Sequence, residues 1–262
     1  MIPALPGGLE VAAQTPLPGG SICEVWQAAL RDGRRVVVKR TPYPAALEAD
    51  GLAALAAAGA PVPTVLAVDE RMLVLERVGG DPDWAGLGAA LAAVHADTGE
   101  AFGWSCDNLI GSLPQDNTPD PHWPTFYVER RIRPWLGARA LPRDLAVRLE
   151  AACAGPLPAL LDTDPAASLI HGDLWSGNVV DGRWLIDPAV CRADRELDLA
   201  FADLFGGLPR AFFDAYTAAW PLPAGWQQRR PALQLYHLLV HVELFGVGYV
   251  GRVADRVDAL GW

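Results

Sequence analysis

The sequence predicts an α+β protein of two lobes: a small lobe over residues 1–78, built on an antiparallel β-sheet with one helix, and a larger, mainly helical lobe over residues 79–262. Short apolar runs separated by turn signals dominate the first third of the chain, whereas apolar residues at helical spacing dominate the rest. Between the two patterns, Gly79-Gly80-Asp81-Pro82 interrupts the chain where a strand ends. A chain of 262 residues is long enough to bury the core that both lobes need.

The small lobe is expected to contain four strands and one helix, in the order strand-strand-helix-strand-strand. Asp32-Gly33 is a strong hairpin-turn signal between the first two strands. An Ala- and Leu-rich run follows; Gly59 ends it, and two prolines prevent its continuation. The expected strands cover residues 21–30, 35–40, 65–68 and 72–78, and the expected helix covers residues 43–58.

The large lobe is expected to be helical, with a short strand and a hairpin beside its most polar motif. Residues 98–124 are irregular and rich in proline, and a loop of this length in a compact domain is usually functional or specific to a family. The expected helices cover residues 84–96, 125–136, 143–161, 195–205, 209–220, 226–246 and 250–260, the strand covers 168–170, and the hairpin joins 178–180 to 183–186. We expect a ligand site in the cleft between the lobes.

The composition argues against several classes of function. The chain has 31 acidic and 21 basic residues and a formal net charge of -10, so we expect no nucleic-acid partner. No apolar run reaches the ~18 residues of a membrane helix, and the first residues lack the pattern of a signal peptide. The four cysteines have no metal-binding spacing, which predicts reduced thiols. We therefore expect a cytoplasmic monomer without membrane association.

The stretch HGDLWSGNVV, residues 171–180, places polar residues where a buried strand should end. His171 and Asp173 form an H-x-D pair, Asn178 follows five residues after the aspartate, and Asp187 ends the apolar run WLID. The same residue types at the same spacing form the catalytic loop and the metal-binding aspartate of protein kinases. The spacing predicts phosphoryl transfer, with Asp173 as the base and with Asn178 and Asp187 as Mg²⁺ ligands. The alternative, that Asp173 and Asn178 only cap a turn, leaves the joint spacing unexplained.

Lys39 offers an independent test of the kinase interpretation. It ends the apolar run Val36-Val37-Val38 and is the only lysine in a sequence that otherwise uses arginine. A compact ammonium on a flexible stem suits the α- and β-phosphates of ATP. Glu48, nine residues later on the predicted helix, is expected to pair with Lys39 and to orient it. The alternative is an ordinary surface lysine at the end of a strand.

A glycine pair directly precedes the first predicted strand. Gly19, Gly20 and Ser21 are expected to cover the ATP phosphates with backbone N–H groups, although the stretch is not a G-x-G-x-x-G loop. Cys23 follows two residues later. We interpret it as a small packed apolar residue, with a redox-sensitive thiol as the alternative.

HGDLWSGN, followed by IDPAVCRADRELDLAFADLFGG, closely resembles the fructosamine kinase family, a branch of the aminoglycoside phosphotransferase and choline kinase group. GGSICEVW, FGWSCDNLIGSLPQDN, WPTFYVERRIRP and LYHLLVHVELFGVGY agree, so the similarity extends from about residue 8 to residue 250. The resemblance implies a protein-kinase-like fold and the ATP- and Mg²⁺-dependent phosphorylation of the 3-hydroxyl of ketosamines. These are fructosamines or ribulosamines, free or on glycated protein lysines. The phosphorylated product decomposes and returns the amine, which repairs the glycation.

The resemblance also implies roles around the nucleotide. Glu76, Arg77 and Val78, at the end of the last predicted strand of the small lobe, would offer backbone groups to the adenine. His171 would brace the catalytic loop by hydrogen bonding. Asp187 is followed by Pro-Ala instead of Phe-Gly, and no long activation loop follows. These departures from protein kinases imply a small-molecule kinase that is always active.

On the substrate side the resemblance leaves alternatives open. Trp175 would form part of the sugar-amine pocket, or would be a packed aromatic. Asp194, with Glu196 and Asp198, would give an acidic cleft for a cationic amine, or would only favour the start of a helix. Trp220 would line the substrate side or fill the core.

Two other functions compete with ketosamine phosphorylation. The nearer alternative is a phosphotransferase of the same group that acts on an aminoglycoside, choline or homoserine; the WSGN element favours ketosamines. The more distant alternative is a non-catalytic nucleotide-binding scaffold. It is disfavoured because Lys39, Asp173, Asn178 and Asp187 are all present together.

Overall fold

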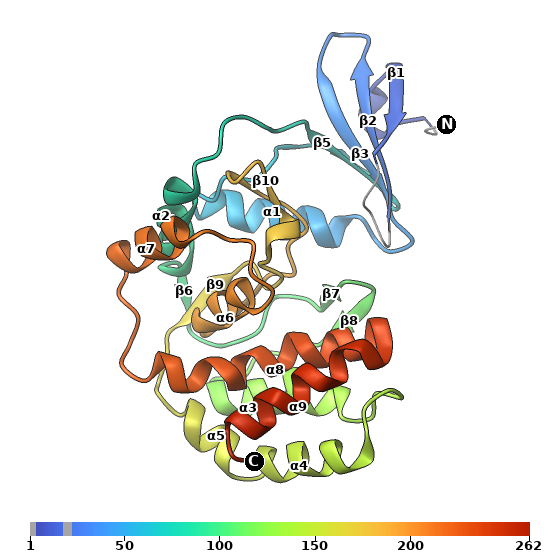
Figure 1. Cartoon of the computed structure of the whole chain (residues 1–262). Helices are drawn as coiled ribbons and strands as arrows, with labels where there is room; N and C mark the ends of the chain where they lie inside the picture. Colours follow the sequence, from blue (N-terminus) through green and yellow to red (C-terminus); the bar gives the residue numbers. More distant parts are fainter. Residues whose placement is uncertain (1–3, 18–22) are drawn as a thin grey trace.

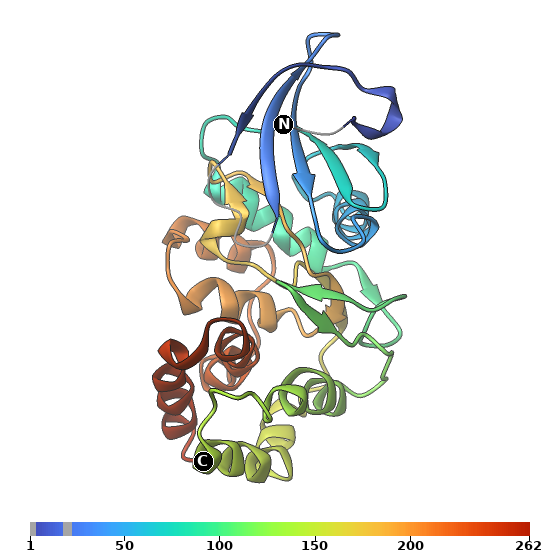
Figure 2. The same ribbon diagram turned by 90° about the vertical axis from the view of Figure 1, so that its right-hand side faces the viewer.

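The computed structural model describes residues 4–17 and 23–262, and it has the two predicted lobes (Figure 1). The sheet of the small lobe, in blue, lies at one end of the molecule, and most helices of the large lobe gather toward the other (Figure 1, Figure 2). The α+β arrangement of a small antiparallel-sheet lobe and a larger helical lobe is therefore confirmed.

The small lobe is a five-stranded antiparallel sheet in the order β1-β2-β3-β5-β4. After a 3-10 turn at Pro6–Gly8, its elements are β1 (Val11–Pro16), β2 (Glu24–Leu30), β3 (Arg35–Arg40), α1 (Ala46–Ala57), β4 (Val65–Val68) and β5 (Met72–Glu76). Strand β1 adds to the four strands predicted. Its sequence, VAAQTP, gives no sign of a strand because no residue in it is fully buried and the apolar residues do not alternate with polar ones.

The side chains of β3 alternate between the two faces of the sheet. Val36 and Val38 are fully buried in an apolar cluster with Trp26 of β2. Val37 and Lys39 project to the opposite face, where they line a cavity. Because side chains alternate along a strand, Lys39 lies on the face of β3 that lines the cavity.

The large lobe contains eight helices in its described residues, together with short strands that form three small sheets, β12-β9-β6, β10-β11 and β7-β8. The helices are α2 (Trp84–His95), α3 (Trp123–Tyr127), α4 (Arg143–Cys153), α5 (Pro156–Leu161), α6 (Glu196–Leu204), α7 (Arg210–Ala219), α8 (Trp226–Phe245) and α9 (Val250–Ala259). The strands are β6 (Thr98–Gly99), β7 (Asn108–Ile110), β8 (Leu113–Gln115), β9 (Ala167–Ile170), β10 (Val179–Val180), β11 (Trp184–Leu185) and β12 (Cys191–Ala193).

Some predicted elements of the large lobe are wrong in detail. The single helix predicted over 143–161 is two helices, because Gly155 and Pro156 break it between α4 and α5. The stretch 98–124, predicted to be irregular, contains three short strands and the start of α3. Helix α3 continues through a π-helical turn and a 3-10 turn to Trp135, which accounts for the helix predicted over 125–136.

The lobes share part of their core. One apolar cluster joins Leu52 of α1 and Leu73 of β5 to Leu87 of α2 and Phe212 of α7. Gly88 allows α2 and α7 to pack closely, because a Cβ at this position would lie 2.2 Å from the carbonyl oxygen of Phe212.

One helical segment, Trp226–Ala259, is long and apolar enough by composition to cross a membrane, with a mean hydropathy of 1.2 in its most apolar window. Half of that window is buried inside the protein. Leu235, Leu238 and Leu239 of α8 lie in the core cluster of the large lobe, as expected of a central helix in a globular domain.

Candidate active site

A cavity of about 770 Å³ lies between the sheet of the small lobe and the large lobe. Its upper wall comes from β2, β3, α1 and the end of β5. Its lower wall comes from the 171–180 loop, the segment after β11, the β7–β8 turn and α8. Most of the predicted site residues meet here.

Lys39 lies at the centre of a cluster of charges that joins three elements. Its Nζ donates to Glu48 Oε1 at 2.7 Å and to Oε2 at 2.9 Å, and it also forms an ion pair with Asp187. Burial lowers the pKa of Lys39, but the charges of Glu48 and Asp187 outweigh it, so the pKa is raised and the ammonium keeps its proton. Burial raises the pKa of Glu48, against the charge of Lys39.

Asp173 and Asn178 contact each other as the kinase-loop spacing requires. Asn178 Nδ2 donates to the carbonyl oxygen of Asp173 at 2.8 Å and to its Oδ2 at 2.9 Å. Burial raises the pKa of Asp173 to about 7; the hydrogen bond from Asn178 opposes the shift, and the charges of Asp187 and Asp198 add to it. A carboxylate with a pKa near neutral is suited to accept a proton from a hydroxyl.

His171 does not line the cavity; its ring supports the 171–180 loop through two hydrogen bonds. It is fully buried; its Nε2 donates to the carbonyl oxygen of Ile186 at 3.0 Å, and its Nδ1 accepts from the backbone N–H of Asp173 at 3.2 Å. The ring therefore ties the residue before Asp187 to Asp173. Gly172 between them has φ 81°, and a Cβ there would lie 2.0 Å from the carbonyl oxygen of Ala189, so only glycine fits.

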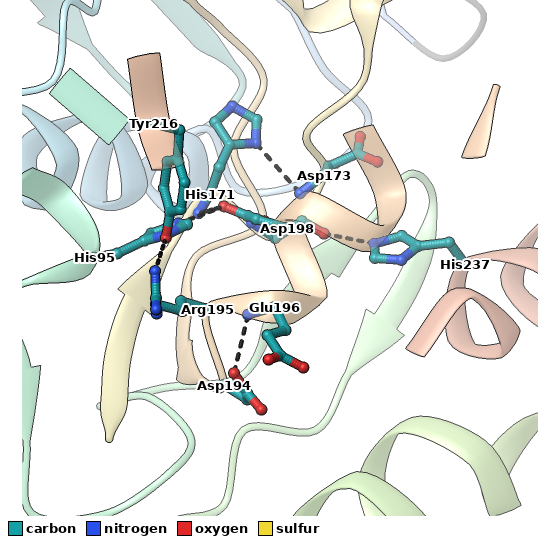
Figure 3. Close-up of polar contacts among 10 residues, drawn as sticks. His95, His171, Asp173, Asp194, Arg195, Glu196, Asp198, Tyr216 and His237 are labelled. Carbon is teal, nitrogen blue, oxygen red and sulfur yellow. Dashed lines mark hydrogen bonds and ion pairs between the residues drawn. The ribbon is translucent and has the colours of Figure 1, made fainter. Parts of the chain in front are cut away.

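Asp198 of α6 is the main functional residue whose position the sequence did not indicate. The motif suggested an acidic cleft, or the start of a helix, but Asp198 is completely buried. Its carboxylate accepts from the backbone N–H groups of His171 at 2.7 Å and Gly172 at 2.9 Å, and it contacts His95 Nε2 at 3.2 Å (Figure 3). Burial raises the pKa of Asp198, but the hydrogen bonds from His95 and from the Gly172 N–H outweigh it, and the pKa is lowered.

Trp175 lines the cavity with 39% of its surface exposed. Its ring lies against Gly177, where an added Cβ would be 2.3 Å from the indole. The tryptophan and the glycine of the WSGN element are therefore linked by packing, because Gly177 leaves the space in which the Trp175 ring lies.

The prediction that Asp194 and Trp220 contact the substrate is not supported, because neither lines the cavity. Asp194 is buried and accepts from the backbone N–H of Glu196 at 2.9 Å, which supports the start of α6. Glu196 is equally buried and pairs with Arg229 at 2.6 Å. Trp220 stacks on the guanidinium of Arg195, 3.9 Å from the ring centre. The acidic group after Asp187 is therefore internal to the lobe.

The structure describes only some of the other residues predicted to bind the nucleotide. Gly19, Gly20 and Ser21 lie outside the described residues. Glu76, Arg77 and Val78 line the cavity. The N–H of Glu76 donates to Thr64 at 2.9 Å and that of Arg77 to Arg35 at 3.2 Å, so both amides already have partners.

Cys23 also lines the cavity. Burial raises the pKa of its thiol, although the charge of Lys39 opposes this shift. The raised pKa does not favour a reactive thiolate.

Part of the lower wall carries none of the predicted site residues. It consists of the β7–β8 turn and one face of α8; its lining residues are Asn108, Leu109, Ile110, Gly111, His237, Val240, His241, Leu244 and Phe245. The sequence offers one signal for it, since His237 and His241 are four residues apart and share a helix face. His241 Nδ1 donates to the carbonyl oxygen of His237 at 2.7 Å.

The residues around Asp187 fit a magnesium ion. The described residues contain no group of three or more His, Cys, Asp or Glu side chains that could hold a metal. Mg²⁺, however, commonly takes only one or two protein oxygens and completes its shell with phosphates and water. The Asp187 carboxylate and the Asn178 amide oxygen are hard ligands of this kind on the same cavity, and the Nδ2 of Asn178 is turned to Asp173.

Comparison with known proteins agrees with this geometry. The family model described as fructosamine kinase matches residues 4–260. A "probable ketoamine kinase" of Thermus thermophilus is 38% identical over 261 residues and covers 96% of each chain. The solved structure of a "putative fructosamine-3-kinase" from Thermobifida fusca is 39% identical, with a TM-score of 0.89 over 97% of this chain and 94% of its own.

A more distant neighbour concerns the fold alone. An aminoglycoside phosphotransferase is 13% identical and superposes with a TM-score of 0.56 over 95% of this chain and 93% of its own. The predicted protein-kinase-like fold is confirmed.

Proposed function

The chain belongs to the fructosamine kinase family and is an ATP-dependent phosphotransferase, and from that premise we propose that it phosphorylates the 3-hydroxyl of ketosamines, which are fructosamines or ribulosamines. The observation that carries the proposal is that Asp173, with a pKa raised to about 7, lines the same cavity as the Lys39–Glu48–Asp187 cluster. Phosphorylation of a hydroxyl needs a base and a phosphate-binding cation on one cavity.

In this proposal the nucleotide lies under the small lobe. Lys39 contacts the α- and β-phosphates, and Glu48 keeps the ammonium directed at them. Because the amides of Glu76 and Arg77 already donate within the protein, adenine is left with the N–H of Val78 and the carbonyl groups of this segment.

Asn178 and Asp187 would hold Mg²⁺, which neutralises charge on the phosphate oxygens when it is bound. Asn178 would serve two purposes. Its amide oxygen would face the ion, while its Nδ2 keeps the Asp173 carboxylate in place.

Asp173 accepts the proton of the 3-hydroxyl as the hydroxyl oxygen forms its bond to the γ-phosphorus and the bond to the β-phosphate oxygen breaks. His171 fixes the backbone of the base, and the short segment after Asp187 leads into α6 without an activation loop. Both features support a site that needs no phosphorylation switch.

The charges of the cavity support a ketosamine over a polycationic aminoglycoside. Among the described lining residues the carboxylates are Glu48, Glu76, Asp173, Asp181 and Asp187. None belongs to the wall formed by the β7–β8 turn and α8, which is apolar apart from Asn108 and two histidines. A sugar with one amine places fewer charges against this wall. Trp175 lines the same cavity and supplies an aromatic face for that amine.

We further propose that the protein is a cytoplasmic monomer that acts in the repair of glycation, on free ketosamines and on glycated lysines of proteins. Decomposition of the 3-phosphate would return the amine. Light scattering on the purified protein tests the monomer, and a glycated lysine peptide tests the larger substrate.

The decisive assay measures ATP consumption with a free fructosamine, a ribulosamine, a panel of aminoglycosides, choline and homoserine. Turnover with either ketosamine, with the phosphate located on the 3-oxygen by ³¹P NMR, supports the proposal. Turnover only with another acceptor would make the protein a different phosphotransferase of the same fold.

A further inference from the structure

We propose that His95, Tyr216 and Arg195 form a buried hydrogen-bonded chain that positions the catalytic loop through Asp198. This inference rests on the proposed function, because it assigns these residues to the same phosphoryl transfer. None of the three lines the active-site cavity. They act on the base, Asp173, from a distance; Figure 3 shows where they lie relative to Asp198 and Asp173.

The chain has one consistent direction of donors and acceptors. Arg195 Nη1 donates to the hydroxyl oxygen of Tyr216 at 2.9 Å. The Tyr216 hydroxyl then has its own proton for His95 Nδ1, 2.8 Å away. This makes Nδ1 the acceptor, so the other ring nitrogen, Nε2, carries the hydrogen and donates it to Asp198 Oδ2 at 3.2 Å.

The chemistry of Tyr216 supports this direction. Burial raises the pKa of its hydroxyl, although Arg195 opposes the shift, so the proton needed by His95 stays on the oxygen. A guanidinium has five N–H donors and no acceptor, so Arg195 can only donate in this contact. The arginine therefore sets the tautomer of the histidine through the tyrosine.

Other contacts hold Arg195 and His95 of this hydrogen-bonded chain in place. Arg195 Nη1 also donates to the carbonyl oxygen of Trp220 at 3.1 Å and Nη2 to that of Pro221 at 2.6 Å, and the guanidinium stacks on the Trp220 ring. His95, the last residue of α2, is held beside Tyr216 of α7 by the close packing of these two helices at Gly88.

The other end of the chain is the backbone just before the base. The two oxygens of Asp198 accept from consecutive N–H groups, those of His171 and Gly172. The carboxylate keeps both contacts only in one orientation, and the N–H of His95 holds it there. Without that donor the peptide before Asp173 is free to tilt, and a shift of about 1 Å at a reacting group can cost ~100-fold in rate.

The test uses three variants and one matched control in the full chain. Tyr216→Phe removes one oxygen and leaves the ring. His95→Leu removes both ring nitrogens, whereas His95→Gln keeps one N–H for Asp198. Ser168→Ala is the control: Ser168 is equally buried, on the strand that leads into the loop, and its hydroxyl has no partner among the described residues.

We expect kcat to fall about tenfold in Tyr216→Phe and further in His95→Leu, with KM for ATP unchanged, because the Lys39 cluster is not touched. His95→Gln should recover most of the His95→Leu loss, and Ser168→Ala should match the wild type. A Tyr216→Phe enzyme with wild-type kcat would overturn the proposal. So would a His95→Gln enzyme no better than His95→Leu, or an equal loss in Ser168→Ala.

Amide hydrogen exchange separates this inference from the proposed function, because it needs no substrate. In Tyr216→Phe the Gly172 amide should exchange at least about tenfold faster, while the amide of Val38 in β3 keeps its wild-type rate. If the wild type fails to phosphorylate a ketosamine but Gly172 responds in this way, only the substrate assignment is lost. If the Gly172 amide exchanges at the wild-type rate, the proposed hydrogen-bonded chain is wrong, whatever the substrate is.

Discussion

The Lys39–Glu48–Asp187 cluster and the Asp198 centre are both built on carboxylates, but they differ in what surrounds them. The first joins three elements across the cavity, and its Asp187 side chain is 44% exposed. The second is sealed inside the large lobe, where the Asp198 and His95 side chains are 0% exposed. Charges at the cavity can exchange partners with a ligand. The buried Asp198 carboxylate instead accepts from two backbone N–H groups. It therefore holds the catalytic loop in one position and does not change partners when a ligand binds.

The largest expected effect lies where the two clusters meet, at Asp173. Asp173→Asn keeps an oxygen for the hydrogen bond from Asn178 but removes the base, so kcat should fall ~10²–10⁴-fold. ATP binding, measured by calorimetry, should stay close to wild type because Lys39 and Glu48 are intact. An Asp173→Asn enzyme with full turnover would disprove the base assignment.

Breaking the Lys39–Glu48–Asp187 cluster should lower both activity and stability. Lys39→Met leaves Glu48 and Asp187 facing each other without a cation; we expect kcat/KM for ATP to fall ~100-fold. The free energy of unfolding should drop by on the order of 2 kcal/mol, less than for a fully buried pair because Asp187 reaches solvent. Denaturant unfolding and steady-state kinetics measure the two effects.

The double variant Lys39→Met/Glu48→Gln is the matched control for this cluster. It removes one of the two unpaired charges, so it should regain much of the stability and none of the activity. If stability and activity return together, the cluster has no specific part in binding the nucleotide.

The buried residue His237 should make the stability of the protein depend on pH. Burial lowers the pKa of His237, whose Nε2 donates to the Gly172 carbonyl oxygen, to about 3, against an ordinary value of 6.5. Below pH 6.5 the unfolded chain takes up a proton at this residue and the folded protein does not, so stability is lost as the pH falls. From pH 7 to pH 5 this histidine should remove about 2 kcal/mol.

The variant His237→Gln keeps a donor for Gly172 but cannot titrate, so its stability should fall less over the same pH range. Urea unfolding at several pH values measures the difference between the two proteins. Parallel pH profiles for the two proteins would show that His237 is not the group responsible.

The smallest expected effect concerns Trp175. In Gly177→Ala the new Cβ would overlap the indole, so the ring must move, and KM for the ketosamine should rise about tenfold while KM for ATP stays constant. Gly137→Ala is the control, since a Cβ at that position meets nothing within 4 Å. Equal effects of the two substitutions on KM would remove Trp175 from the substrate pocket.

The same contrast explains what the sequence could predict. Lys39, Glu48, Asp173, Asn178 and Asp187 were predicted together because the chemistry of phosphates imposes residue types at regular spacings, and the structure places all five on one cavity. The two-lobe fold was predicted because strand and helix periods occupy different parts of the chain.

The buried centre left no such signal in the sequence. His95 lies 103 residues from Asp198 and 121 from Tyr216, so their pairing depends on how α2, α6 and α7 pack. The sequence leaves Asp194 open between a substrate cleft and a helix start, because a carboxylate next to a motif looks the same in both; the structure shows the helix start. Trp220 is open between the substrate side and the core for a similar reason, and in the structure it packs against the core.

Lys39 is the only lysine in the sequence, and it is 7% exposed and held by two carboxylates. Reducing sugars condense with amines in their neutral form, and the Lys39 ammonium keeps its proton because Glu48 and Asp187 raise its pKa. The protein therefore offers sugar aldehydes no lysine side chain to modify. A protein that repairs glycated lysines would itself be protected, at every lysine it has, from the damage it repairs.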